Sequence, residues 1–387
     1  MKPATRLVHA RAPDRGNAKV VNPAIQKGST VLRPDSAALY DDDAYVTYGR
    51  GGLSTHQALV AALCDLEGAV DVQLYPSGVS AVAGALLSVL EAGDELLMVD
   101  TAYKPTRRFC DRTLARYGVE IRYFDPTLPS EDIASLIRAR TRAIFLESPG
   151  SLSFEMQDVP ALAALARERG VISLMDNTWA AGHLFKPLAH GVDVSIQALT
   201  KYVGGHSDSF MGSAAARDPQ IVARLRAGGV DLGWSVAAED AYTMLRGLRT
   251  LDVRLRRHGE SGLAVARWLA GRDEVAAVLH PGLSGAPGHD IWKRDFTGAC
   301  GLLALVLRPA PPAATAAFLD ALELFGLGFS WGGFESLVID CDPQLKVRTY
   351  CKTYGGSLVR LHIGLEDPED LIRDLETGLA AFRDAAG

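Results

Sequence analysis

Short apolar strands alternate with helical segments from residue 53 to about residue 235, and this alternation limits the possible folds more than any other feature. We expect strands at 70–75, 95–99, 120–124, 142–147, 171–176 and 192–197. One of the intervening helices is marked by Asp158 and Pro160 at its start and by Gly170 at its end. The pattern predicts an α/β domain with a mostly parallel sheet covered by helices.

The rest of the chain predicts a second, smaller α/β domain. Leucines spaced by three and four residues indicate one long helix over 236–270. We interpret its arginines as a solvent-exposed face: Arg246, Arg249, Arg254, Arg256 and Arg257. Further strands are expected at 300–308, 335–340 and 357–363. A chain of 387 residues is too long for one ordinary core, so we expect domains at 53–245 and 246–387.

Composition excludes several classes of protein. A formal net charge of −6 argues against nucleic acid held by bulk electrostatics. No apolar run approaches the ~20 residues of a membrane span, and the N-terminus leads into no apolar signal segment. The five cysteines lack CxxC spacing and the histidines lack metal spacing, which indicates free thiols in a reducing cytoplasm and no metal site.

Two neighbouring strands end in side chains with complementary chemistry. Asp176 closes the strand at 171–176, and Lys201 follows the strand at 192–197 in a loop softened by Gly204 and Gly205. An isolated lysine in such a loop is usually a surface residue, but the carboxyl ends of parallel strands meet at one edge of a sheet. Pyridoxal phosphate (PLP) needs such a pair, since a lysine forms its Schiff base and a carboxylate pairs with its pyridinium nitrogen.

Two further positions suit anions. Gly78 and Val79 lie where a strand turns into a helix expected at 81–90, and backbone N–H groups at a helix start can bind a phosphate. A glycine in such a turn is common and indicates little by itself. Arg360 lies among apolar residues of the strand at 357–363, where burying it without an anion would be costly.

The runs at 174–179, 195–208 (SIQALTKYVGGHSD) and 360–367 resemble the cysteine/methionine-metabolism family of PLP enzymes, above all bacterial cystathionine β-lyases. The resemblance extends over nearly the whole chain. It implies the aspartate-aminotransferase-like fold (fold type I), with Lys201 holding PLP and moving protons and Asp176 serving the ring nitrogen. The implied reaction is PLP-dependent α,β-elimination of L-cystathionine to homocysteine, pyruvate and ammonia, in methionine biosynthesis.

The resemblance also implies roles for other residues. Tyr103 would stack on the PLP ring and is a candidate proton donor. Thr200 would add a hydroxyl to the phosphate site. Arg360 would clamp the substrate α-carboxylate, in a pocket completed by Ser330 and Trp331.

An N-terminal arm at residues 1–52 precedes the first domain. Taken alone, it could be a disordered tail, although its apolar and aromatic residues are more than a tail usually exposes. The resemblance implies that the arm packs on a neighbouring subunit, with Tyr48 and Arg50 reaching the partner's PLP phosphate. It also implies a homotetramer built as a dimer of dimers.

Two departures bear on the choice of reaction. The γ-lyases of the family place a serine where this chain has Ala198, which favours the β-lyase branch. Bacterial β-lyases place a tyrosine near Val230, which implies a different pocket here for the far end of the substrate. The alternatives are therefore γ-elimination or γ-replacement, β-lyase activity on another cysteine S-conjugate, or a PLP-fold protein without turnover.

Overall fold

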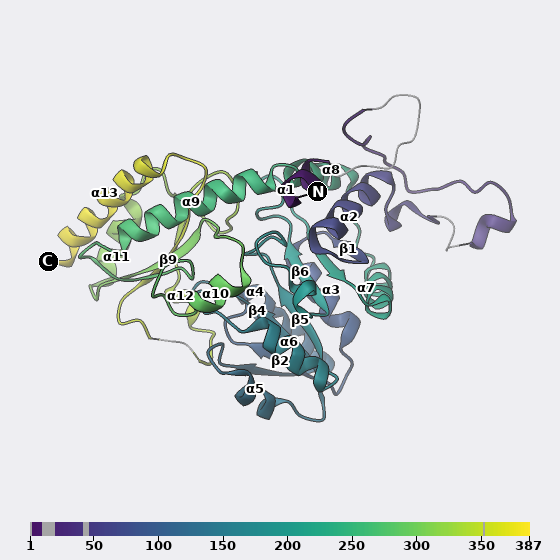
Figure 1. The fold of residues 1–387 in the computed structure, drawn as a ribbon, viewed down its shortest axis with the longest axis horizontal. Helices are drawn as coiled ribbons and strands as arrows, with labels where there is room; N and C mark the ends of the chain where they lie inside the picture. Colours follow the sequence, from purple (N-terminus) through teal and green to yellow (C-terminus); the bar gives the residue numbers. More distant parts are fainter. Residues whose placement is uncertain (1, 10–19, 42–45, 351–352) are drawn as a thin grey trace.

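A computed structural model describes residues 2–9, 20–41, 46–350 and 353–387 (Figure 1). The larger of its two sheets has seven strands in the order β1-β7-β6-β5-β4-β2-β3. These strands are β1 (Asp71–Tyr75), β2 (Glu95–Val99), β3 (Glu120–Phe124), β4 (Thr141–Glu147), β5 (Ile172–Asp176), β6 (Val194–Ala198) and β7 (Gly212–Ala216). The six strands expected in this region are confirmed to within two residues at each end.

The direction of the strands brings the carboxyl ends of β4, β5 and β6 to one edge of the sheet. Strands β3, β2, β4, β5 and β6 pair in parallel, and only β7 runs against its neighbours. Glu147 of β4 lies beside Asp176 of β5, and Asp176 lies beside Ile196 of β6. The mostly parallel sheet is thus confirmed, with the carboxyl ends of its central strands side by side.

Helices pack around this sheet. Those of the larger sheet are α2 (Ser54–Glu67), α3 (Gly78–Val89), α4 (Lys104–Phe109), α5 (Ser130–Leu136), α6 (Val159–Glu168) and α7 (Pro219–Asp231). Helix α3 packs on β1, β6 and β7, while α6 packs on β5. The expected capping of α6 is confirmed, because the Asp158 side chain accepts the N–H of Ala161 and Gly170 follows the helix with a positive φ.

The second sheet has five strands in the order β10-β11-β12-β9-β8. They are β8 (Val275–Leu279), β9 (Leu302–Leu307), β10 (Gly326–Leu327), β11 (Leu337–Asp340) and β12 (Leu358–His362). Its helices are α10 (His289–Asp295), α11 (Pro312–Asp320), α12 (Asp342–Leu345) and α13 (Pro368–Ala386). Helices α11 and α13 pack together and share an apolar core with β9 and β12. The smaller C-terminal α/β unit is confirmed.

The single helix expected over 236–270 is wrong. Two helices replace it, α8 (Ala238–Leu248) and α9 (Leu251–Leu269), and α9 runs from beside α8 to the C-terminal sheet (Figure 1). The solvent-exposed assignment of Arg254 is also wrong, because this side chain is buried and donates to backbone carbonyls, including that of Tyr202 at 2.6 Å. The predicted boundary at residue 245 falls inside α8 and stays a prediction.

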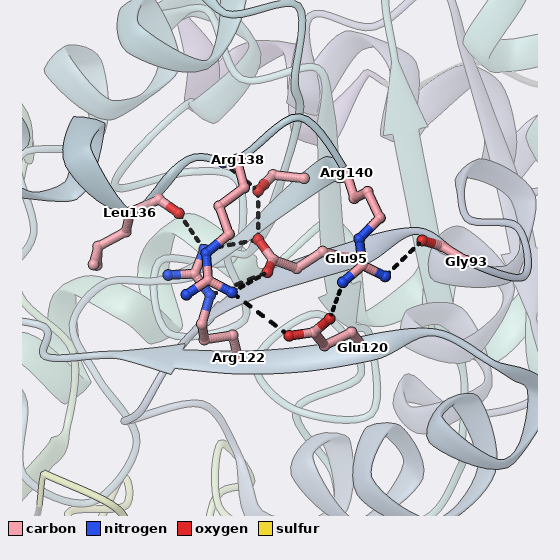
Figure 2. Close-up of polar contacts among 8 residues, drawn as sticks. Gly93, Glu95, Glu120, Arg122, Leu136, Arg138 and Arg140 are labelled. Carbon is pink, nitrogen blue, oxygen red and sulfur yellow. Dashed lines mark hydrogen bonds and ion pairs between the residues drawn. The ribbon is translucent and has the colours of Figure 1, made fainter.

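An ion network closes the amino end of the large sheet (Figure 2). The carboxylate of Glu95, the first residue of β2, accepts hydrogen bonds from Arg122 at 2.7 and 3.1 Å and from Thr141. Arg138 adds an ion pair at 3.4 Å and also approaches Glu120. Every oxygen of this buried carboxylate is therefore satisfied.

The cysteines and the membrane-span expectation can both be checked in the structure. The cysteines within the described ranges, Cys64, Cys110, Cys300 and Cys341, are free, while Cys351 lies outside those ranges. In the same ranges no helix combines the length and apolarity needed to cross a bilayer.

Candidate active site

Lys201 lies in a tight loop directly after β6, and other elements hold that loop from two sides. Arg254 of α9 donates to the carbonyls of Tyr202 and Val203 at 2.6 and 3.3 Å. On the other side, a Cβ atom at Gly332 would lie 2.8 Å from the carbonyl carbon of Lys201, and Gly332 has a φ of 88°. Only glycine suits such a close approach with that backbone conformation. The lysine backbone is therefore fixed.

The side chain of Lys201 is largely buried among polar partners. Its Nζ donates to Ser330 Oγ at 2.6 Å and lies 5.4 Å from the ring centre of Trp331. Burial, helped by the positive charge of Arg360 and opposed by Asp176, lowers the pKa of Lys201 to about 8. A larger fraction of this amine than of an ordinary lysine amine is therefore neutral, and nucleophilic, near neutral pH.

Asp176 ends β5 at the same edge and points an unused oxygen into the site. Its Oδ1 accepts the backbone N–H of Thr178 at 3.0 Å and the Thr178 hydroxyl at 2.5 Å. Its Oδ2 accepts no hydrogen bond from any described residue. Burial raises the pKa of Asp176, while the bonds from Thr178 and the charge of Lys201 oppose that rise. A ring N–H cation would fit the free oxygen and favour the carboxylate form.

The turn into α3 forms a cradle for an anion. The backbone N–H groups of Gly78 and Val79 have no acceptor among the described residues. A Cβ atom at Gly78 would lie 2.5 Å from Cβ of Ala198, so a larger residue would disturb the cradle. Two free N–H groups at a helix start suit a phosphate. The hydroxyl of Thr200 already bonds to the backbone N and O of Met211, at 3.0 and 3.1 Å, so its contribution to the phosphate stays a prediction.

A cavity of about 410 Å³ joins the catalytic candidates to the substrate candidates. The predicted residues that line it are Tyr103, Asp176, Lys201, Ser330, Trp331 and Arg360. Arg360 is only 5% exposed and donates from Nη2 to Ser330 O at 2.8 Å, while its buried Nε has no partner. Ser330 has a φ of 84°, a strained value that is typical of functional loops. A guanidinium that lines a cavity fits a carboxylate ligand.

Sequence reasoning missed Glu147, which also lines this cavity. It ends β4 next to Asp176, and its Oε2 accepts the backbone N–H of Tyr103 at 2.7 Å. Burial, together with the negative charge of Asp176, raises the pKa of Glu147 well above its ordinary value. Burial, with the negative charges of these two carboxylates, also raises the pKa of Tyr103. The strand-end rule that indicated Asp176 would have indicated Glu147 as well.

Tyr48 and Arg50 do not line the cavity of their own chain. Tyr48 is half exposed, makes an isolated β-bridge with Thr30, and lies under the guanidinium of Arg50 at 5.7 Å. The arm extends away from the body of the subunit (Figure 1). It exposes large apolar side chains: Val20, Val21, Ile25, Leu32, Leu39 and Tyr40.

Comparison with known proteins decides what this site belongs to. The family model described as Cys/Met metabolism PLP-dependent enzyme matches residues 4–380. This chain belongs to that family. The putative cystathionine beta-lyase of Rhizobium johnstonii is 47% identical over 97% of this chain and 96% of its own. The cystathionine beta-lyase of Escherichia coli is 43% identical over 97% of this chain and 98% of its own.

A solved structure supports the fold on the same scale. The cystathionine gamma synthase from Xanthomonas oryzae pv. oryzae, in complex with aminoacrylate and cysteine, has a TM-score of 0.89 and 31% identity. The match covers 100% of this chain and 99% of that one. The fold is therefore that of a fold type I PLP enzyme, and PLP is the cofactor of the family. Within the family, the chain is a carbon–sulfur lyase of the cystathionine beta-lyase type.

Proposed function

We propose that this enzyme cleaves the Cβ–S bond of L-cystathionine by α,β-elimination, with water, to give homocysteine, pyruvate and ammonia. The observation that carries the proposal is the convergence of Lys201, Asp176 and Arg360 in one cavity. A base, an anionic partner for a ring nitrogen and a carboxylate clamp are the groups that such a reaction needs. A protein without turnover would have no chemical use for all three.

The residues divide the work by position. Arg360, which lines the cavity, binds the substrate α-carboxylate and so orients the Cα–H bond. Lys201 takes the Cα proton with its neutral amine, which its lowered pKa makes available. Asp176 holds the proton on the ring nitrogen through its free oxygen. PLP, when bound, supplies the electron sink for the pair released at Cα.

The leaving sulfur then needs a proton. Lys201 carries the one taken from Cα, and Tyr103 keeps its own because its pKa is raised by burial and by two nearby carboxylates. Either group can serve as the donor. Breaking the Cβ–S bond releases homocysteine, and the remaining enamine hydrolyses to pyruvate and ammonia.

The second candidate function is γ-elimination or γ-replacement, which the same fold would catalyse at the γ-carbon of the substrate. It draws support from the full-length likeness to a cystathionine gamma synthase at 31% identity. Incubation with cystathionine distinguishes the two, because β-cleavage yields pyruvate and γ-cleavage yields 2-oxobutyrate. Pyruvate as the major keto acid is the expected result, and 2-oxobutyrate as the major product would overturn the proposal.

We further propose that the enzyme works as a homo-oligomer, a tetramer built from dimers, in the cytoplasm. The exposed apolar side chains of the arm support an interface. Tyr48 and Arg50 lie outside their own cavity, which supports a role at the phosphate of a neighbouring subunit. The bacterial relatives and the free described cysteines support the cytoplasm.

Mixing two variants that are impaired in different ways tests the shared site. Arg50→Ala should weaken PLP retention, and Lys201→Ala should abolish turnover. If Arg50 acts across subunits, a mixed dimer has one site lacking both groups and one intact site, so activity returns on mixing. Confirmed subunit exchange without returning activity would contradict the proposal for Arg50.

A further inference from the structure

We propose that Lys104 and Arg108 recognise a carboxylate on the leaving half of the substrate and so determine specificity. This inference rests on the proposed β-elimination and adds the class of leaving group. Both residues belong to α4, directly after Tyr103, and both line the active-site cavity. They are four positions apart, so their side chains project from the same face of the helix.

The adjacent residue Arg107 has a different environment from Lys104 and Arg108. Its buried guanidinium pairs with Asp100 at 2.6 Å and donates to Val347 O at 2.7 Å. Lys104 is half-buried and Arg108 exposed, and neither makes a hydrogen bond or ion pair with any described residue. Like charges four residues apart on a helix are destabilising. Because Lys104 and Arg108 have no acidic partner among the described residues, they are suited to bind an anionic group of a ligand.

The charges of the cavity leave this pair unmatched. The basic and acidic lining residues are Lys104, Arg108, Glu147, Asp176, Lys201 and Arg360. Lys201 is used by the cofactor and Arg360 by the α-carboxylate. Asp176 serves the ring nitrogen, and Glu147 accepts the backbone N–H of Tyr103 and makes no ion pair with Lys104 or Arg108. Among the described residues, Lys104 and Arg108 therefore have no ion-pair partner.

The phosphate of PLP does not account for the pair. The N–H groups suited to that phosphate belong to Gly78 and Val79, and neither residue lines the cavity that Lys104 and Arg108 line. Apolar lining residues complete the wall of the cavity: Pro149, Leu152, Phe154, Phe329 and Trp331. An alkyl chain attached to sulfur would pack against these residues and place a terminal carboxylate near Lys104 and Arg108.

The arrangement favours a leaving group of net negative charge. Cystathionine carries an ammonium beside its distal carboxylate, and α4 has no carboxylate next to Lys104 and Arg108 to pair with that ammonium. S-(3-carboxypropyl)-L-cysteine has the same chain and carboxylate without the ammonium. We therefore expect the holoenzyme to cleave it at least as efficiently as cystathionine.

The test compares S-(3-carboxypropyl)-L-cysteine with S-butyl-L-cysteine, which replaces the carboxylate by a methyl group. Both release pyruvate by the same elimination, so the ratio of their kcat/KM values isolates recognition of the distal charge. We expect the carboxylate to be preferred by about tenfold or more. The preference should fall as ionic strength rises.

Substitutions then assign the preference to residues. Lys104→Gln and Arg108→Gln should each reduce the ratio, and the double variant should bring it near one. Arg112→Gln is the matched control, since Arg112 is an exposed arginine one turn further along that does not line the cavity. Arg108→Glu should raise the relative kcat/KM for S-(3-aminopropyl)-L-cysteine, a gain that misfolding cannot produce.

The outcomes separate the two proposals. Pyruvate from both compounds with a ratio near one, or a ratio that the Lys104 and Arg108 substitutions leave unchanged, overturns this inference alone. Pyruvate from neither compound nor from cystathionine overturns the proposed β-elimination, and this inference with it.

Discussion

The large sheet buries carboxylates at both of its ends, but only one end pairs them fully. At the amino end, Glu95 is saturated by Arg122, Arg138 and Thr141 (Figure 2). At the carboxyl end, the described residues leave one oxygen of Asp176 without a hydrogen bond and give the Glu147 carboxylate one, from the backbone N–H of Tyr103.

The pKa values follow this difference. Burial alone would raise the pKa of Glu95, but the hydrogen bonds and charges of its partners outweigh burial and lower it. Burial prevails at Glu147 and Asp176 and raises their pKa values. A buried charge with complete partners supports the fold, whereas one without them is a cost that a ligand can relieve. The amino end of the sheet thus contributes to stability, and the carboxyl end to chemistry.

Lys201→Ala should give the largest effect, at the carboxyl end. Turnover should be lost, together with the visible absorbance of the lysine-bound cofactor. The apoprotein should nevertheless become more stable at pH 7, by up to about 3 kcal/mol, because the lowered pKa means that folding buries a charge. That gain should fade as pH rises through about 8 towards the ordinary value of 10.5. An unchanged absorbance spectrum would contradict the assignment of Lys201.

Asp176→Asn should come next. The variant should bind PLP, but an amide cannot hold the ring proton as an anion does. We expect kcat to fall by about a thousandfold, with the free energy of unfolding little changed. Steady-state kinetics on the PLP-loaded variant measure the effect. A near-normal kcat would mean that another group serves the ring nitrogen.

Glu95→Ala should show the opposite behaviour, at the amino end. Removing one member of a buried ion pair leaves Arg122 without its partner and should cost about 3 kcal/mol of unfolding free energy. The kcat of the folded enzyme should stay within about twofold. Glu120→Ala, at the exposed edge of the network, is the control and should cost less than about 1 kcal/mol. Because the pKa of Glu95 is lowered, the difference between parent and Glu95→Ala should shrink as pH falls through that lowered value.

Strand ends are the part of the molecule that the sequence predicts best. Each expected strand of the large sheet ends where an apolar run stops, and that rule is enough to bring Asp176 and Lys201 to the same edge. Strand β7 was missed because Gly-Ser-Ala-Ala-Ala lacks the β-branched and aromatic residues that mark strands. It forms because both of its neighbours, β1 and β6, supply hydrogen-bonding partners.

Side-chain direction is the part that the sequence predicts least. Arg107 and Arg108 are adjacent in sequence, yet one is buried against Asp100 and the other lines the cavity. Arg254 looked like its exposed neighbours on one helix, but the carbonyls that it binds come from the lysine loop, about fifty residues earlier. Periodicity finds a helix and its apolar face. It does not say which charged residue will meet a distant loop.

Glu147→Gln should give the smallest change and tests whether the carboxyl end holds one working carboxylate or two. The raised pKa means that the folded protein keeps a proton on Glu147 at pH values where the unfolded chain has released it. Stability therefore falls as pH rises from the ordinary carboxylate value towards the raised one. Glutamine is neutral in both states, so the variant should be more stable than the parent, with a gain that grows with pH.

Glu147→Gln should have little effect on kcat. The amide oxygen of glutamine can still accept the N–H of Tyr103, so kcat should stay within about threefold of the parent at pH 7. Glu147→Leu removes the acceptor and should cost more, because Tyr103 loses the bond that fixes its backbone. If Glu147→Gln instead lowers kcat as severely as Asp176→Asn, Glu147 exchanges a proton during turnover. The contrast between the two ends would then rest on two active carboxylates at the β4 and β5 ends.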